Sequence, residues 1–400
     1  MTRPPTLLAL ASYIKGQEFL REAKRQGARV LLLTRQKLAD EDWPMQFVDD
    51  RFLMPDLNNR EHIINAVSYL ARSEHLDRIV PLDEFDLEVA STLREHLRVP
   101  GMGETTVRYF RDKLAMRMRA REKGIVVPDF VPILNRERIG EFLDRVPAPW
   151  ILKPRLSASA IGIKKISERG ELWPLVDSLG DKQSYYLLER FIEGDVFHVD
   201  SVVWQGNVDF AEAQGYMRPP FDVYHGGGLF CTRTLDRDAA TTRELEDANR
   251  DVVQALGMLR GVLHTEFICG RGDGRVYFLE TAARVGGAYI AETVEAATGI
   301  NLWREWARVE VADARGDQYM VGPSRQDFAG VIVSLARQEW PDTSAYSDAE
   351  IVWRLRKRHH VGLIVASSDR ERVERLLDSY MRRFGEDFQA TLPAADEAHE

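Results

Sequence analysis

The stretch LHTEFICGRGDGRVYFLETAARVGG, from Leu263 to Gly287, decides the fold of this chain. Two short apolar segments flank a glycine-rich turn, which predicts an antiparallel hairpin. Glu266 lies on the first predicted strand and Glu280 on the second, so the hairpin can bring the two carboxylates to one place. Two carboxylates supply the hard oxygen ligands that Mg²⁺ prefers. Arg284, four residues later, suits negative charge that develops on a transferring phosphoryl group.

The composition is that of an ordinary globular chain, and its 400 residues suffice for roughly two or three domains. The net charge of −9 and the absence of a basic tail in the sequence argue against a nucleic-acid partner. The two cysteines, Cys231 and Cys269, have no metal-ligand spacing and suit the reducing cytoplasm. No apolar run approaches the roughly 18 residues of a membrane span, so we expect a cytoplasmic protein without a membrane partner.

The first hundred residues alternate apolar runs with amphipathic segments. Residues 7–12 and 28–34 are predicted strands, and residues 16–27 between them are a predicted helix. A further predicted strand at 77–82 and a helix at 87–97 complete a small, doubly wound parallel α/β domain. The first turn has one glycine where a dinucleotide fingerprint needs three, so we do not predict NAD binding there.

The pattern changes after the glycine- and proline-rich break at 100–103. Residues 150–316 are predicted to be mostly strands and hairpins. A strand at 329–336, a helix, a strand at 361–367 and a helix at 370–384 follow. We expect this βαβα segment to pack as a lid-like subdomain.

Two lysines precede the hairpin in settings that suit a phosphate site. Lys153 ends an apolar segment and is followed by a loop of serine and alanine residues, whose small side chains let backbone N–H groups approach a polyphosphate. Lys113 lies on a predicted helix. Taken singly, such lysines are more commonly solvated, and so are acidic pairs on hairpins. The order of these groups along the chain therefore supports the functional prediction better than any one of them.

A polar segment lies between the second lysine and the hairpin. Glu189 ends a predicted strand, where its side chain and the backbone of Arg190 and Phe191 can meet the amino edge of adenine. His198 and Asp200 alternate with apolar residues and so share one face of the next strand. The plain alternatives are a charged strand end and a solvent-facing polar row.

These segments together resemble the ATP-grasp superfamily of carboxylate–amine ligases. The resemblance covers roughly residues 1–320 and lies in DKLAMR, ILKPRLSASAIGIKKI, LLERFIEGDVFHVDSVVWQGNV and the hairpin. It implies a mixed α/β and α+β fold. Its predicted parts are an N-terminal doubly wound α/β domain (1–104), a small ATP-grasp subdomain (105–186), a large ATP-grasp subdomain with the metal site (187–320) and a small C-terminal α/β lid segment (321–400).

The resemblance also implies roles for individual residues. The residues that it implies for nucleotide binding are Lys113, Lys153, Ser157, Ser159, Glu189, Arg190, Phe191, Asp195 and His198. The implied metal ligands are Glu266 and Glu280, and Arg284 acts with Lys153 in catalysis by opposing charge on the acyl phosphate. ATP and Mg²⁺ are the implied cofactors, and a small-molecule carboxylate and amine are the implied partners. The oligomeric state stays open, with a homodimer as one form found among related enzymes.

The chain departs from the family pattern at three places. Val196 stands where many members carry a glutamate for the ribose, and neighbouring Asp195 is the substitute that we consider. Ala282 stands where many carry an asparagine, so the number of bound Mg²⁺ ions, one or two, stays open. The phosphate loop is also poor in glycine. L-amino-acid ligases resemble this chain in having E-x-A-x-R, here from Glu280 to Arg284, which favours an amino acid as one substrate.

The predicted activity is ATP-dependent joining of a carboxylate and an amine, into an amide or peptide bond, through an acyl phosphate. The substrate candidates are Arg218, Tyr224, His225, His264, Gly286 and Gly287. A core histidine and a loop without a ligand are the plain alternatives for these positions. Two other functions remain: an ATP-grasp phosphotransferase that forms no amide, and a non-catalytic ATP-binding module. An amine requirement for product formation separates the ligase from the first, and turnover separates it from the second.

Overall fold

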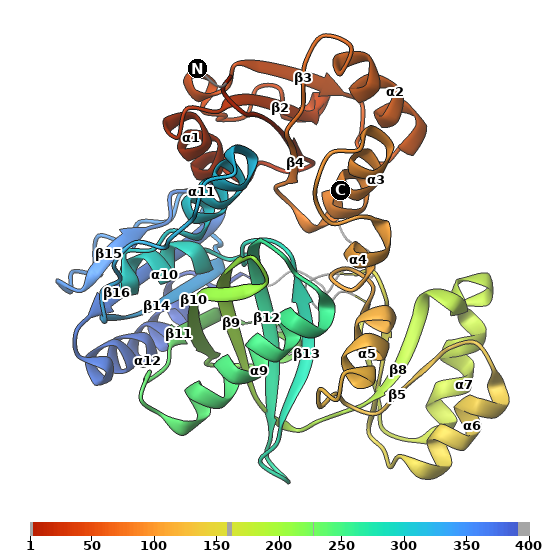
Figure 1. Ribbon diagram of the computed structural model, residues 1–400. Helices are drawn as coiled ribbons and strands as arrows, with labels where there is room; N and C mark the ends of the chain where they lie inside the picture. Colours follow the sequence, from red (N-terminus) through yellow and green to blue (C-terminus); the bar gives the residue numbers. More distant parts are fainter. Residues whose placement is uncertain (1–2, 158–161, 227, 391–400) are drawn as a thin grey trace.

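Three β-sheets and the helices around them make up the computed structural model, which describes residues 3–157, 162–226 and 228–390 (Figure 1). In Figure 1 the N-terminal sheet stands at the top, the C-terminal strands lie at the left, and a small separate sheet lies at the lower right. None of the helices in these ranges is both long and apolar enough to cross a lipid bilayer.

The N-terminal part is a parallel sheet covered on both faces. Its elements are β1 (Thr6–Ala11), α1 (Gln17–Arg25), β2 (Arg29–Arg35), the 3₁₀ helices η1 (Gln36–Leu38) and η2 (Met45–Phe47), β3 (Asp50–Met54), α2 (Arg60–Leu70), β4 (Arg78–Pro81), η3 (Glu84–Asp86) and α3 (Leu87–Leu97). The strands lie in the order β3-β2-β1-β4, and all pairs are parallel. Buried side chains of α2 and α3 cover one face, and those of α1 cover the other. The predicted doubly wound α/β fold of this part is therefore confirmed.

The small sheet is antiparallel and carries helices on one face. Its elements are β5 (Phe130–Pro132), α6 (Arg136–Arg145), β6 (Trp150–Pro154), β7 (Lys164–Ile166), α7 (Arg169–Ser178), η4 (Gly180–Tyr185) and β8 (Tyr186–Arg190), and α4 (Glu104–Arg108) and α5 (Lys113–Glu122) precede them. The strands lie in the order β5-β8-β6-β7. Because side chains alternate along a strand, Leu152 and Leu188 face the core under α6 and α7 while Lys153 and Glu189 face the opposite side.

The large sheet has eight antiparallel strands, in the order β13-β12-β9-β10-β11-β14-β16-β15. Its first elements are β9 (Gly194–Trp204), β10 (Asn207–Tyr216), α8 (Pro220–Gly226), β11 (Phe230–Thr234), α9 (Ala240–Leu256), β12 (Gly261–Gly270), β13 (Val276–Ala282), α10 (Ile290–Thr298) and α11 (Leu302–Arg315). The last are β14 (Phe328–Leu335), β15 (Ile351–Arg354), β16 (His360–Ser367) and α12 (Arg370–Asp387). Strands β12 and β13 form the predicted hairpin, and Glu266 pairs directly with Glu280 across it.

The C-terminal segment differs from the predicted βαβα order. Residues 337–350 between β14 and β15 contain no helix in the described structure, so the predicted helix there is wrong. Pro341 interrupts any helical pattern in this stretch. Because β14 and β16 are antiparallel neighbours, the chain returns without a helical crossover. The C-terminal strands therefore extend the large sheet, and α12 packs on them.

A second difference lies between residues 150 and 316. The prediction of mostly strands and hairpins there is incomplete, because α9, α10 and α11 also lie in this region. Helix α11 covers the face of the N-terminal sheet that α1 occupies, and it also contacts β9 and β12 of the large sheet. It therefore joins the two sheets, as Figure 1 shows.

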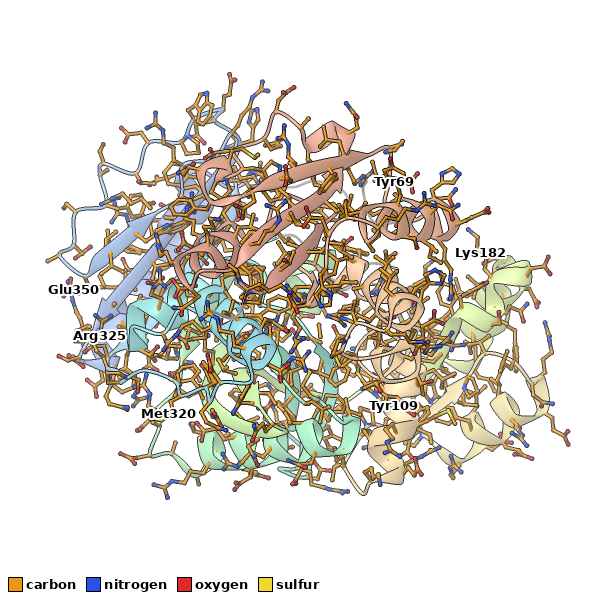
Figure 2. All side chains as sticks on the ribbon, turned by 45° about the horizontal axis from the view of Figure 1, so that its top comes forward. Tyr69, Tyr109, Lys182, Met320, Arg325 and Glu350 are labelled. Atoms are coloured by element: carbon orange, nitrogen blue, oxygen red, sulfur yellow. The ribbon has the colours of Figure 1, made fainter. Side chains whose placement is uncertain are left out.

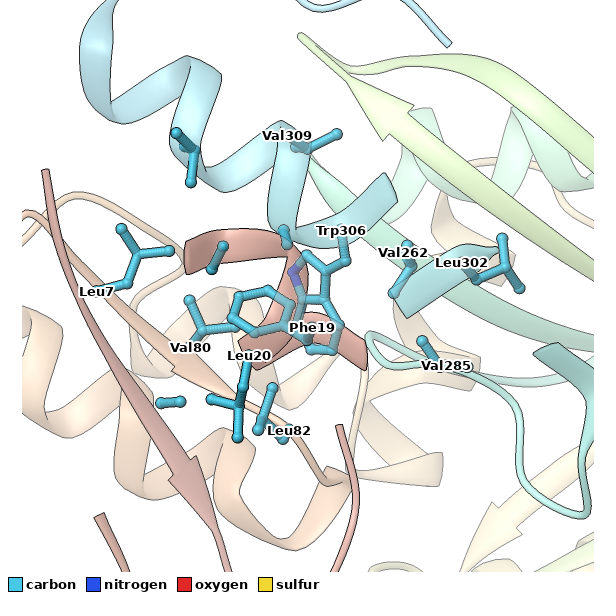
Figure 3. Close-up of a cluster of buried hydrophobic side chains, with 14 of the residues drawn as sticks. Leu7, Phe19, Leu20, Val80, Leu82, Val262, Val285, Leu302, Trp306 and Val309 are labelled. Carbon is cyan, nitrogen blue, oxygen red and sulfur yellow. The ribbon is translucent and has the colours of Figure 1, made fainter. Parts of the chain in front are cut away.

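A single apolar cluster forms this junction. Phe19 of α1 packs edge-on against Trp306 of α11, with ring centroids 5.5 Å apart and planes at 72° (Figure 3). Leu82 after β4 and Val262 of β12 belong to the same cluster. Burial of these side chains therefore holds the N-terminal domain against the hairpin strand β12.

Replacing Phe19 with alanine should lower the free energy of unfolding by about 3 to 5 kcal/mol, because it removes a buried aromatic side chain. Urea unfolding followed by circular dichroism measures this change. Tyr69→Ala is the matched control, since the Tyr69 side chain is 70% exposed on α2 (Figure 2). Its effect should stay below about 0.5 kcal/mol. Similar losses from both substitutions would contradict this description of the junction.

Candidate active site

A cavity of about 1470 Å³ lies between the small sheet and the large sheet. Lys153 on β6 and Glu189 on β8 reach it from the small sheet. Glu266 on β12 and Glu280 on β13 reach it from the large sheet. Lys113, the first residue of α5, also lines it. The fold therefore brings together charged groups that lie far apart in the sequence.

Most of the residues predicted from the sequence line this cavity. They are Lys113, Lys153, Ser157, Glu189, Arg190, Phe191, Asp195, Arg218, His264, Glu266, Glu280, Arg284 and Gly287. His198 and Gly286 are not among the lining residues. Ser159 lies outside the described residues, and so do the side chains of Tyr224 and His225 at the end of α8. The individual roles of these residues stay predictions.

The two predicted metal ligands face each other across the hairpin. Lys113 Nζ lies 3.1 Å from Glu280 Oε2 and donates to the Ser157 carbonyl at 2.5 Å. The Tyr216 hydroxyl donates to Glu266 Oε1 at 2.7 Å. The paired carboxylates border an open cavity, so protein oxygens and water can surround a divalent ion there. This donor set fits Mg²⁺.

Lys153 is held by a buried carboxylate. Its Nζ lies 2.5 Å from Glu189 Oε1, and Arg117 Nε lies 3.0 Å from Glu189 Oε2. Burial lowers the pKa of Lys153 to about 8, although the charge of Glu189 offsets part of this effect. Burial acts to raise the pKa of Glu189, but the charges of Arg117 and Lys153 outweigh it and hold that pKa below its usual value. The Glu189 side chain is thus engaged with two cations. The backbone N–H groups of Arg190 and Phe191 donate to the carbonyls of Asp129 and Pro149, at 2.8 and 3.0 Å, so they are not free for an adenine edge.

Arg284 is held by a residue of the N-terminal domain that sequence analysis missed. Its Nη2 and Nε lie 2.6 and 3.0 Å from Glu84 Oε2, and Arg111 Nη1 lies 3.1 Å from Glu84 Oε1. Burial acts to raise the pKa of Glu84, but the charges of Arg284 and Arg111 lower it to about 2. Glu84 follows β4 at the carboxyl edge of a parallel sheet, where α/β folds bind ligands. That position was the signal that could have revealed it.

A row of buried polar groups lies behind Glu266. Asp200 accepts hydrogen bonds from Nδ1 of His198 at 2.6 Å and from Nδ1 of His264 at 2.9 Å. His198 Nε2 lies 2.8 Å from Thr232 Oγ1. Burial acts to lower the pKa of His264, but Asp200 raises it to about 9. His198 therefore belongs to this buried row and does not reach the cavity.

Comparison with known sequences finds relatives among ligases. No protein-family model matches the chain. It is 25% identical over 272 residues to the L-arginine-specific L-amino acid ligase of Bacillus subtilis, which covers 66% of this chain and 65% of that protein. It is 27% identical over 186 residues to a D-alanine–D-alanine ligase of Chlorobium phaeobacteroides, which covers 42% of this chain and 50% of that protein. The chain thus spans about two thirds of the length of the first of these curated relatives and about half of the length of the second.

Comparison with solved structures identifies the fold. The L-amino acid ligase from Bacillus licheniformis has a TM-score of 0.76 at 19% identity, over 97% of this chain and 99% of that chain. The N5-carboxyaminoimidazole synthetase from Staphylococcus aureus, solved with ADP, has a TM-score of 0.72 at 15% identity, over 95% and 98%. The chain has the ATP-grasp fold. The resemblance and the fold class predicted from the sequence are confirmed.

Replacing Glu84 with glutamine should destabilise this protein by about 3 kcal/mol at pH 7, because two buried guanidinium groups lose their countercharge. The pKa of Glu84 is about 2 when folded against an ordinary value of 4.5. Its contribution is therefore complete above pH 4.5 and is lost as the pH falls towards 2. Urea midpoints measured from pH 7 to pH 3 should show the variant and wild type converging.

Glu88→Gln is the control for this experiment, because Glu88 is exposed on the neighbouring helix α3. Its urea midpoint should follow that of the wild type at every pH. If the difference in urea midpoint between Glu84→Gln and wild type keeps its full size at pH 3, that result would contradict the ion-pair account.

Proposed function

We propose that this protein is an ATP-dependent ligase that joins a carboxylate to an amine through an acyl phosphate. The convergence of charged groups of three kinds in one cavity supports the proposal. These groups are Lys113, Lys153, Glu266, Glu280 and Arg284. Lysines suit phosphate oxygens, paired carboxylates suit a divalent ion, and an arginine suits a developing oxyanion.

The nucleotide lies between the two sheets in this proposal. Lys113 and Lys153 contact its phosphates, and the backbone carbonyls of Arg190 and Phe191 accept from the adenine amino group, because their N–H groups are already hydrogen-bonded. Val196 packs in an apolar cluster and cannot bind a ribose hydroxyl. Asp195 at the cavity rim is the remaining carboxylate in that position.

Glu266 and Glu280 hold the divalent ion in this proposal. When bound, the ion neutralises charge on the phosphoryl oxygens and polarises them for attack. Lys113 is ion-paired with Glu280 and lies beside the phosphate loop at Ser157. Its amino group can therefore exchange the carboxylate for a phosphate oxygen without a large movement.

The reaction has two steps. The acid substrate attacks the γ-phosphoryl group of ATP and gives an acyl phosphate and ADP, and the amine then displaces phosphate from the acyl carbon. Arg284 opposes the negative charge in both steps. Because Glu84 already fixes the guanidinium group, its orientation costs little when the substrate arrives. Hydrolysis of the intermediate by water has to be limited, and the two sheets lie on either side of it in this proposal.

An amino acid is the proposed class for one substrate. The E-x-A-x-R pattern ending at Arg284 supports this, and so do the names of both curated relatives, which specify amino acids. Arg218 and Gly287 line the cavity and suit the α-carboxylate of such a substrate.

The finer assignments of a cytoplasmic location and a homodimer also remain proposals. They rest on the two free cysteines, Cys231 and Cys269, and on the family resemblance respectively.

The test of this function measures ADP released from Mg-ATP by the purified protein across a panel of carboxylic acids that includes the amino acids. Each acid is assayed with and without amines, and hydroxylamine is added in parallel to trap acyl phosphate. We expect one acid to stimulate ADP release, to yield a hydroxamate, and to form an amide only when its amine is present. Glu280→Gln should lose turnover by at least about a hundredfold, because one metal carboxylate is removed.

Glu193→Gln is the control variant, because Glu193 lines the same cavity at an exposed position outside the proposed machinery. Its turnover should stay near that of the wild type. Full activity of Glu280→Gln would contradict the metal assignment. ADP with a phosphorylated product and no amine requirement would support the phosphotransferase instead, and ATP binding without turnover on any acid would support a non-catalytic module.

A further inference from the structure

The small side chain of Ala282 leaves room beside the proposed metal ligands. Ala282 pairs across the hairpin with His264, two residues along each strand from the pair Glu266 and Glu280. Residues two apart on a strand point to the same side, so these four side chains share one face. A cavity of about 20 Å³ lies here, lined among others by His264, Glu280 and Ala282 and by three cations, Arg111, Lys113 and Arg284, but not by Glu266. This volume is enough for about one water molecule, and the three cations make it unsuitable for a metal ion, which belongs in the large cavity instead.

One nitrogen of His264 is already fixed behind this space. Nδ1 donates to Asp200 Oδ1 at 2.9 Å, and both groups are buried. Gly286 packs directly on this hydrogen bond, because a Cβ at that position would lie 2.9 Å from Asp200 Oδ1 and 3.0 Å from His264 Nδ1. Metal-binding histidines commonly have this arrangement, in which a carboxylate orients the ring and leaves Nε2 as the ligand atom.

The other nitrogen faces Glu266, one of the two proposed metal ligands. His264 Nε2 lies 3.6 Å from Glu266 Oε1, and His264 lines both the large cavity and the small one. Two ligand atoms that each lie about 2.1 Å from one ion are about 3 to 4 Å apart. We infer that His264, through Nε2, is a third protein ligand of the ion held by Glu266 and Glu280. The inference rests on the proposed function, because it assumes an ion at those two carboxylates.

A different ion position inside the buried row is less suitable. Ligand atoms of His198, Asp200 and His264 lie within 4.8 Å of one another. Those of Glu266, Glu280 and His264 do not all lie so close in the described structure, so the Glu280 side chain has to turn towards an ion that His264 and Glu266 share. In the buried row, however, each oxygen of Asp200 already accepts a hydrogen bond from one of the histidines. Neither His198 nor Asp200 lines either of these two cavities. The ion therefore belongs on the cavity side of His264, with Asp200 behind the ring.

An imidazole ligand changes which ions the site prefers. Mg²⁺ favours oxygen ligands and gives up water reluctantly, whereas first-row transition ions accept imidazole readily. A site of Glu266, Glu280 and His264 should therefore bind Mn²⁺ more tightly, relative to Mg²⁺, than a site of carboxylates alone. The ion takes the place of the proton on His264 Nε2, which is released to solvent.

Pulsed EPR of bound Mn²⁺ tests this inference without relying on activity. The full chain is labelled with ¹⁵N in its histidines only and loaded with one equivalent of Mn²⁺ and a non-hydrolysable ATP analogue. We expect a ¹⁵N coupling from a directly bound imidazole, and the isotope separates it from the ¹⁴N nuclei of adenine and the backbone. This measurement needs no substitution, so misfolding of a variant cannot obscure it.

Variants then assign the coupling to one histidine. His264→Gln should abolish the coupling and weaken Mn²⁺ binding at least about tenfold, with a smaller effect on Mg²⁺. Asp200→Asn keeps the imidazole but loses its orienting carboxylate, and it should weaken Mn²⁺ binding about tenfold. His75→Gln is the matched control, because His75 is 70% exposed in the N-terminal domain. It should change neither the coupling nor the affinity.

The possible failures separate the inference from the proposed function. Mn²⁺ binding that depends on Glu280 but shows no histidine coupling would overturn the role of His264 and leave the two-carboxylate site intact. A coupling that survives in His264→Gln would also overturn that role. Mn²⁺ binding that is unaffected by Glu280→Gln would overturn the metal site of the proposed function itself.

Discussion

The neutralisation of buried cations by carboxylates from other elements is the interaction on which the site depends. Lys113 pairs with Glu280 of the hairpin, Lys153 with Glu189 of a neighbouring strand, and Arg284 with Glu84 of the N-terminal domain. An unpaired charge at these depths would cost several kcal/mol, so the pairs keep the cations in place without a ligand. Two of the three pairs join different parts of the fold. The same contacts therefore hold the cavity together and preserve the charges that phosphate chemistry requires.

The sequence predicts the site where the needed information is local. Glu266 and Glu280 are recognisable because a short turn joins their strands, which fixes their pairing within one hairpin. Glu84 and Arg117 escaped prediction because their partners lie 200 and 72 residues away in the sequence. The family resemblance implied His198 for nucleotide binding, and alternation identifies the face of a strand on which His198 lies but not what covers that face. Tertiary packing decides such positions.

The fold shows the same division between local and distant information. The N-terminal alternation of strand and helix is predictable because each apolar run is continuous and buried on both faces. Helix α9 was missed although Leu245, Val252, Val253 and Leu256 recur at helical spacing, so that signal was present in the sequence. The helix expected after β14 is absent from the described chain because an antiparallel neighbour needs no crossover. Strand direction could not be derived from the local pattern.

The central claim is that ATP activates a carboxylate as an acyl phosphate in this cavity, and transfer of oxygen from the acid to phosphate tests it most directly. The acid that supports ADP release is labelled with ¹⁸O at both carboxylate oxygens and turned over with its amine, and the phosphate is examined by ³¹P NMR. An acyl phosphate passes one carboxylate oxygen to the departing phosphate, so the account predicts one ¹⁸O in each phosphate released. Amide formation with phosphate that contains no ¹⁸O would contradict it.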